Sequence, residues 1–177
     1  MLRSLVGSEM CIRDSCRIVD IHEFLAEKGV KLSGVTGVKY MYHDPCHSPM
    51  KLQDPLKTVN ELIQLEDGKA IQKNDRCCGE SGTLAVTRPD ISTQVRFRKQ
   101  IEMEKGANDL RKGDFTGEVK VLTSCPSCLQ GLTRFDADSD TTADYIVVEM
   151  AQKILGKDWM QDYVTKANQG GIERVLV

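Results

Sequence analysis

Two stretches of similar design decide the fold: Val38-Lys-Tyr-Met-Tyr-His-Asp-Pro-Cys-His47 and Val119-Lys-Val-Leu-Thr-Ser-Cys-Pro-Ser-Cys128. Each begins with a short run of β-branched, aromatic or long apolar residues, which is the pattern of a strand. Each run then passes directly into a turn that carries cysteine. Ligands of open α/β sheets bind outside the carboxyl ends of the strands. We therefore expect Cys46, Cys125 and Cys128 to converge at one edge of a sheet.

Segments with helical periodicity surround these two strands. We expect helices over residues 17–28 and 87–110, and three more that begin near Asp54, Thr142 and Trp159. Strands that alternate with helices predict an α/β fold with a mostly parallel sheet. In this fold class, helices flank the sheet and the cysteine-bearing loops lie at the C-terminal ends of strands.

Composition limits the classes of function. The chain has 177 residues, a formal net charge of −2 and seven cysteines. A nucleic-acid binder usually carries a strong basic excess, so we expect no nucleic-acid partner. No apolar run approaches the roughly 20 residues that span a bilayer, and no secretory signal is visible. We therefore expect a cytoplasmic protein, with a peripheral place on the inner face of the membrane as an alternative. Clustered cysteines in that reducing compartment indicate metal ligands or catalytic thiols.

The first fifteen residues differ from the rest. Residues 3–15 show neither helical nor strand periodicity, and residues 6–15 resemble the translated sequencing-adapter scar found at the ends of some gene predictions. Such a segment is excluded from fold reasoning, and Cys11 with it. We expect residues 16–177 to form one domain, the C-terminal fragment of a longer protein.

Five cysteines form the candidate metal site, with the pattern C-x30-CC-x46-CxxC. Both thiols of an adjacent pair reach one site only if the backbone turns, and Gly79 and Gly82 permit that turn. Glycines also let backbone N–H groups approach sulfur, which tunes the potential of a cluster. Five thiolates exceed the four ligands of a tetrahedral zinc site and suit an iron–sulfur cluster, although a soft sulfur set is compatible with either. The predicted metal ligands are Cys46, Cys77, Cys78, Cys125 and Cys128.

The charged and imidazole side chains near the cysteines are expected to orient a loop or to face solvent. His43 and His47 flank Cys46, and we expect them to orient the loop by hydrogen bonds rather than to bind metal. The charged residues Arg96, Arg98 and Lys99 of the long helix are expected to form a solvated face.

At these residues the sequence resembles a known family. The motifs His43-Asp-Pro-Cys-His47, Cys77-Cys-Gly-Glu-Ser-Gly82 and Cys125-Pro-Ser-Cys128 resemble the cysteine-rich "CCG" domain found in heterodisulfide reductase, in the glycolate oxidase iron–sulfur subunit and in lactate-utilisation proteins. The resemblance covers about residues 17–160. It implies that the five cysteines bind a cluster, which in the heterodisulfide reductase relatives is a non-cubane [4Fe–4S] cluster. Some relatives bind zinc at the equivalent site.

Two further segments narrow the resemblance. Thr83-Leu-Ala-Val-Thr-Arg-Pro-Asp90 and Asp144-Tyr-Ile-Val-Val-Glu149 are similar to the C-terminal part of bacterial fusions that join an FAD-linked oxidase of the D-lactate dehydrogenase type to its iron–sulfur part. The resemblance implies an electron-transfer module of an FAD-linked 2-hydroxy-acid dehydrogenase. It also implies a flavin-bearing partner, a further iron–sulfur domain and a quinone or other acceptor.

This chain itself lacks a Gly-rich dinucleotide fingerprint, so FAD would bind only to the missing part or the partner. We therefore expect the isolated chain to be inactive and to contain no catalytic residue. Two alternatives stay open, a catalytic cluster of the heterodisulfide reductase kind and a zinc-stabilised interaction domain.

Overall fold

The computed structural model describes residues 19–46, 48, 54–80 and 84–170. The expected N-terminal segment 1–15, with Cys11, lies outside these residues, as do His47 and Gly82. Four strands form the main sheet in the order β4 (Gln72–Lys73), β2 (Val38–Tyr42), β5 (Glu118–Thr123) and β6 (Thr142–Tyr145). A smaller sheet pairs β1 (Leu32–Val35) with β3 (Ile63–Leu65). Every pairing is parallel, which confirms the predicted α/β class.

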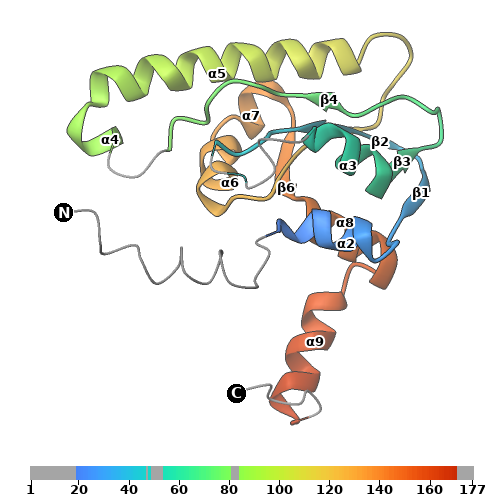
Figure 1. Cartoon of the computed structure of the whole chain (residues 1–177). Helices are drawn as coiled ribbons and strands as arrows, with labels where there is room; N and C mark the ends of the chain where they lie inside the picture. The colour runs from blue at the N-terminus through green and yellow to red at the C-terminus, as the bar shows by residue number, and fades with distance from the viewer. Residues whose placement is uncertain (1–18, 47, 49–53, 81–83, 171–177) are drawn as a thin grey trace.

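Helices cover both faces of the main sheet (Figure 1). Helix α5 (Pro89–Leu110) and helix α6 (Pro126–Thr133) pack on one face. Helices α2 (Ile21–Glu27), α3 (Pro55–Leu62) and α8 (Ile146–Leu155) pack on the other. The remaining helices are α4 (Leu84–Thr87), α7 (Asp136–Ser139) and α9 (Trp159–Asn168).

Strand β2 shows why the sheet is buried on both sides. Successive side chains of a strand point to opposite faces. Tyr40 and Tyr42 accordingly join the core beneath α3 and α8, whereas Met41 joins the core beneath α5. Both tyrosines and the methionine are almost fully buried. Such two-sided burial is typical of parallel strands covered by helices.

Some element boundaries differ from the sequence prediction. Asp54 caps α3 as expected, because its carboxylate accepts from the backbone N–H of Leu56. The helix nevertheless stops at Leu62, since Ile63 begins β3 and pairs with β1. The predicted start of a helix near Thr142 is wrong, because Thr142 starts β6 opposite Lys120 of β5 and α8 begins only at Ile146. In each case strand pairing overrides the local helical signal.

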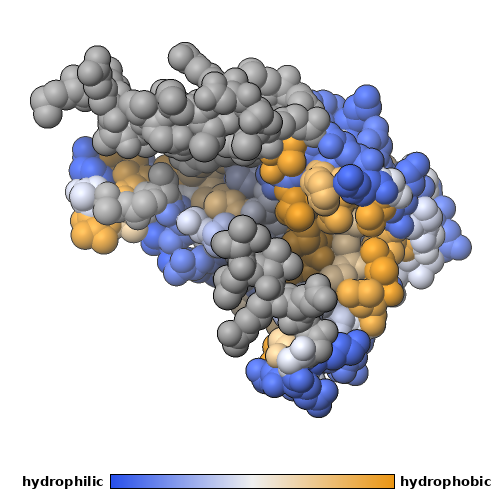
Figure 2. Space-filling model, turned by 60° about the horizontal axis from the view of Figure 1, so that its bottom comes forward, coloured by the Kyte–Doolittle hydropathy of each residue, from blue (hydrophilic) through white to orange (hydrophobic). Residues whose placement is uncertain are grey.

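Helix α9 stands apart from the cores. None of its residues is buried, and the side chain of Tyr163 is 55 % exposed. Figure 1 shows this helix projecting away from the sheet. Large apolar side chains are exposed on α2, α8 and α9. Figure 2, in which the bottom of Figure 1 is turned forward, shows a strip of apolar residues on this face. Within the described residues, no helix combines the length and the apolar character needed to cross a bilayer.

Candidate metal centre

The register of β2 and β5 brings two cysteine loops to the same edge of the sheet. Tyr42 lies opposite Leu122, and the backbone N–H of His43 donates to the Leu122 carbonyl at 2.8 Å. The segments that carry Cys46 and Cys125 therefore leave the sheet side by side. This is the convergence that the two sequence stretches predict.

The Cys77–Cys78 loop turns at Gly79, as expected. Gly79 has a φ of 77°, and a Cβ atom there would lie 2.8 Å from Cγ of Arg96. Its backbone N–H donates to the sulfur of Cys77 at 3.4 Å. Its carbonyl accepts from the Ser92 hydroxyl at 3.3 Å, which ties the turn to α5. Gly79 thus supplies both the turn and an N–H group at sulfur.

Glu102 of α5 holds the preceding part of the same loop. Its carboxylate accepts from the backbone N–H groups of Asp75 at 2.6 Å and Arg76 at 3.0 Å. Hydrogen bonds from N–H groups to a charged acceptor are stronger than neutral ones. The 22-residue helix is therefore a support to which the cysteine loop is attached at several points.

Helix α6 carries the last two cysteines. Cys125 is the N-cap, Pro126 occupies the first turn, where it costs no hydrogen bond, and Cys128 lies one turn in. The positive end of the helix dipole favours thiolates at these positions. Gly131 allows the helix to approach the Cys77–Cys78 loop, because a Cβ atom there would lie 3.1 Å from the Cys78 carbonyl oxygen. Sequence analysis did not identify Gly131.

Three buried side chains form the centre of the site. His43, Cys78 and Cys128 each place a potential ligand atom within 4.8 Å of the others. The sulfurs of Cys78 and Cys128 are 3.4 Å apart. Two thiolates on one tetrahedral metal with metal–sulfur bonds of ~2.3 Å would be about 3.8 Å apart. The thiol pair therefore fits a shared metal centre with little movement.

Electrostatics favours one thiolate in this pair. The hydrogen bond from Cys128 lowers the pKa of Cys78, and the His43 ring adds to this effect although burial opposes it. The same hydrogen bond raises the pKa of Cys128, and burial and the nearby Cys125 thiol raise it further. Cys78 is accordingly the thiol most ready to bind a metal ion.

The other predicted ligands lie around this centre. Cys125 is half-buried and close enough to Cys128 to influence it, whereas Cys46 and Cys77 are exposed. The tight group among the described residues does not include these three. Gly82, the second predicted glycine, is not among the described residues. The structure thus brings together two of the five cysteines tightly and places the other three in the neighbouring loops.

A buried lysine underlies the site, contrary to the sequence prediction. Lys99 is 0 % exposed and not part of a solvated face. Its Nζ atom lies 3.0 Å from Nδ1 of His43 and contacts the side-chain and backbone oxygens of Asn74. Burial lowers the pKa of Lys99 to about 8, although nearby acidic groups and thiols oppose the shift. The spacing of charges along the helix carried no signal for this contact.

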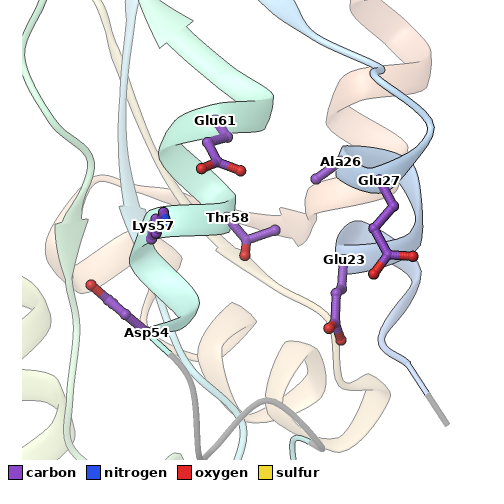
Figure 3. Close-up of a pocket in the computed structure, with 7 residues that line it drawn as sticks. All are labelled: Glu23, Ala26, Glu27, Asp54, Lys57, Thr58 and Glu61. Carbon is purple, nitrogen blue, oxygen red and sulfur yellow. The ribbon is translucent and has the colours of Figure 1, made fainter. Parts of the chain in front are cut away.

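A hollow with different chemistry lies away from the cysteines. It measures about 410 Å³ and lies between α2 and α3 (Figure 3). Carboxylates dominate its lining, which holds neither thiol nor imidazole, and Asp54 already caps α3. The residues around it are Glu23, Ala26, Glu27, Asp54, Lys57, Thr58 and Glu61.

Comparisons with known proteins give family models and relatives that match this chain. The family model described as "Cysteine-rich domain" (CCG) matches residues 40–133, and a domain of unknown function (DUF3400) matches residues 133–177. One relative is the B subunit of the fumarate reductase (CoM/CoB) of Methanothermobacter marburgensis. The two chains are 32 % identical over 117 residues, which is 63 % of this chain and 21 % of the relative.

Two further relatives carry iron–sulfur in their names. The glycolate oxidase iron-sulfur subunit of Escherichia coli is 30 % identical over 96 residues, 52 % of this chain and 23 % of the relative. An uncharacterized iron-sulfur protein of Methanocaldococcus jannaschii is 28 % identical over 114 residues, 63 % of this chain and 21 % of the relative. The chain thus spans about a fifth of the length of these relatives. No solved structure matches it significantly. Because the CCG model covers more than half of the chain and includes all five clustered cysteines, the chain belongs to the cysteine-rich CCG domain family.

Proposed function

We propose that residues 16–177 form an iron–sulfur electron-transfer domain of an oxidoreductase. The observation that carries the proposal is the buried Cys78–Cys128 pair at the edge where three cysteine loops meet. Soft sulfur ligands favour iron–sulfur clusters or zinc over hard cations. The names of two relatives include iron–sulfur, and two relatives are subunits of oxidoreductases, which favours the redox alternative.

Several features of the chain support a cluster site. Cys78 and Cys128 supply a ligand pair that needs little rearrangement, and Cys125 lies beside them. Cys46 and Cys77 are exposed in the neighbouring loops and would complete the ligand set. The Gly79 N–H group already donates to a ligand sulfur. A bound [4Fe–4S] cluster, cubane or non-cubane, would supply one-electron transfer at this edge.

The partner that fits this role is a flavin-bearing dehydrogenase of 2-hydroxy acids, of the D-lactate or glycolate type. Removal of hydride from such a substrate needs a flavin or nicotinamide, because the cofactor carries that chemistry. The sequence has no Gly-rich dinucleotide turn, and one relative is the iron–sulfur subunit of a glycolate oxidase. Electrons would pass from the flavin through this domain to a further cluster, a quinone or another acceptor.

A zinc site is the second candidate, and His43 is the observation that favours it. Zinc accepts mixed nitrogen and sulfur ligands in a tetrahedron. His43, Cys78 and Cys128 form a group of that kind, and Cys125 is near enough to complete it. In this case the domain would be a structural module without redox chemistry.

Anaerobic reconstitution separates the two candidates. The purified chain is incubated with iron and sulfide, or with zinc, and its metal and acid-labile sulfide are measured with its visible absorption. We expect bound iron and sulfide in similar amounts and a broad absorption band that bleaches on reduction. Zinc at one equivalent with no retained sulfide would overturn the proposal.

A second assay tests the electron-relay role. The reconstituted chain is mixed with D-lactate or glycolate and an artificial dye. We expect no dye reduction until a flavin-bearing dehydrogenase is added. Substrate-dependent dye reduction by the chain alone would contradict the relay and favour catalysis at the cluster itself.

A further inference from the structure

Lys99 occupies an unusual position for a lysine. It lies on the side of α5 that faces the sheet, and its side chain is completely buried. The amino group ends at His43 Nδ1, 3.0 Å away, and at two oxygens of Asn74. A buried ammonium group is costly unless it is paired and hydrogen-bonded. The hydrogen-bond partners of the Lys99 amino group are the His43 ring and two oxygens of Asn74, and none of them is a carboxylate.

The neighbouring cations differ from Lys99 because each has a carboxylate partner. Arg96 and Arg134 both pair with Glu80, and Arg76 pairs with Glu102. In the described part of the chain, Lys99 forms no ion pair with a carboxylate. Leaving one charge of a buried pair without its partner is strongly destabilising. The ammonium group of Lys99 thus has no carboxylate in direct contact to balance its charge.

The cysteine centre can supply that charge. His43, the neighbour of the amino group, is also the neighbour of Cys78 and Cys128. Among the groups that stabilise charged Lys99 are Glu102 and the thiols of Cys78 and Cys128. A cluster held by thiolates concentrates negative charge at this place, and reduction adds one more unit.

The contact with His43 has a second consequence. Nδ1 of His43 lies 3.0 Å from Nζ of Lys99 and 3.1 Å from the Asn74 carbonyl oxygen, which the amino group of Lys99 also contacts. These contacts hold the His43 ring beside Cys78 and Cys128. Lys99 therefore helps to position His43 at the cysteine centre, and hydrogen bonds to sulfur are among the factors that set cluster potentials.

We propose that Lys99 is a positioning residue for the metal centre: its buried ammonium group is the counter-charge of the cluster and raises the reduction potential. This inference rests on the proposed iron–sulfur function. It assigns a role to a residue that touches neither substrate nor iron and acts through charge and through His43.

The decisive measurement is the midpoint potential of the reconstituted cluster in Lys99→Met. Without the buried charge, the reduced cluster loses stabilisation. We expect the reduction equilibrium to shift at least tenfold toward the oxidised form, which is about 59 mV for one electron. Lys105→Met is the matched control, since Lys105 is an exposed lysine of the same helix and its charge is screened by water. An equal potential in wild type and Lys99→Met overturns the proposal.

Two further variants separate a charge effect from a folding effect. Lys99→Arg keeps the charge and should stay within threefold of the wild-type equilibrium. Asn74→Asp leaves Lys99 in place but puts a carboxylate against its amino group, so it should shift the equilibrium in the same direction as Lys99→Met. If Lys99→Met fails to fold, Asn74→Asp decides, and an unchanged potential there overturns the inference. Failure of the wild type to bind iron and sulfide would instead overturn the proposed function, so the two failures are distinct.

Discussion

The two faces of strand β2 contain buried polar networks of opposite character. On the face toward α8, the Tyr40 hydroxyl donates to Glu149 at 2.6 Å, and Lys120 pairs with the same carboxylate at 2.7 Å. On the face toward α5, Lys99 contacts His43 and Asn74 beside two thiols. Glu149 and Lys99 are both 0 % exposed. The buried carboxylate of Glu149 is thus paired with a cation, whereas the direct hydrogen-bond partners of the Lys99 amino group include no carboxylate.

This difference separates a structural network from a binding site. The Glu149 network is complete, since both carboxylate oxygens have partners, and burial together with Glu149 raises the pKa of Tyr40. Fully satisfied buried networks rigidify a core. In the described part of the chain Lys99 forms no ion pair with a carboxylate, and His43 connects it to Cys78 and Cys128. We therefore expect substitutions on the two faces to have different consequences.

The largest effect is expected for the buried thiols. Cys78→Ser and Cys128→Ser each remove a ligand from the buried pair, and an iron without its ligand is not retained. We expect bound iron to fall at least tenfold after reconstitution, as measured by metal analysis of the folded fraction. The free energy of unfolding of the metal-free protein should change little, because serine is close in size.

Cys11→Ser is the matched control for this prediction, since sequence analysis places Cys11 outside the metal site. Its iron content should equal that of the wild type. Loss of iron in Cys11→Ser comparable to that in Cys78→Ser would show that the ligand set is assigned incorrectly.

For Glu149→Gln we expect a loss of stability without a loss of iron binding. Removing one partner of a buried ion pair costs about 3 kcal/mol, because Lys120 loses its nearer carboxylate. The loss is measured by urea denaturation of the metal-free protein. Iron bound per folded chain should not change. Glu118→Gln is the control, because the exposed Glu118 lies 3.8 Å from the same amino group and should cost less than about 1 kcal/mol. Equal losses for the two variants would contradict the distinction between the networks.

A smaller effect is expected where α6 approaches the cysteine loop. In Gly131→Ala the added methyl group would meet Cγ of Glu80 at 2.6 Å and the Cys78 carbonyl at 3.1 Å. Overpacking of this kind costs about 1–3 kcal/mol, and it pushes Cys78 away from Cys128. We expect weaker iron retention during challenge with a chelator. Gln130→Ala, at an exposed neighbour on α6, should behave as the wild type.

The smallest effect concerns Asp20 at the start of α2. Burial acts to raise the pKa of Asp20, but hydrogen bonds from His22 and Ser124 outweigh it, so the pKa lies below the ordinary 3.8. The stabilisation from the carboxylate is therefore complete above about pH 4 and is lost as the pH falls through the folded-state pKa. Asp20→Ala should cost about 1 kcal/mol at pH 7, as for other N-caps, and much less at pH 2. A loss that is the same at both pH values would contradict this assignment.

Sequence alone predicted the part of the fold that depends on continuous patterns. The strands at residues 38–42 and 118–123 were found because their runs are apolar and end in cysteine turns. Strands β1 and β3 were missed, because Gly34 weakens the first and the second follows α3 without a break. Thr142 resembled a helix cap, and only its pairing with β5 shows that it is a strand residue.

For the site, cysteine spacing predicted the convergence of loops but not the groups that support it. Side chains of a strand alternate between its two faces, so His43, which follows Met41 by two residues, lies on the same side, facing α5. The alternation along the strand could therefore have predicted the position of His43. Asn74, Lys99 and Gly131 had no comparable signal, because their roles depend on the packing of α5 and α6 against the loop. A charged residue within a charged helix stretch is expected to face solvent until its neighbours are known.

The parallel register of β2 and β5 has a practical consequence for protein engineering. Cysteine loops leave one edge of the sheet, so the connection from α5 into β5 lies at the opposite edge. In that connection Gly113 has open space around it, whereas Gly117 packs against the backbone of Gly37. A peptide tag or a fluorescent reporter inserted at Gly113 should leave the metal ligands in place. The same insertion between residues 118 and 125 would shift the strand and separate the thiols from one another.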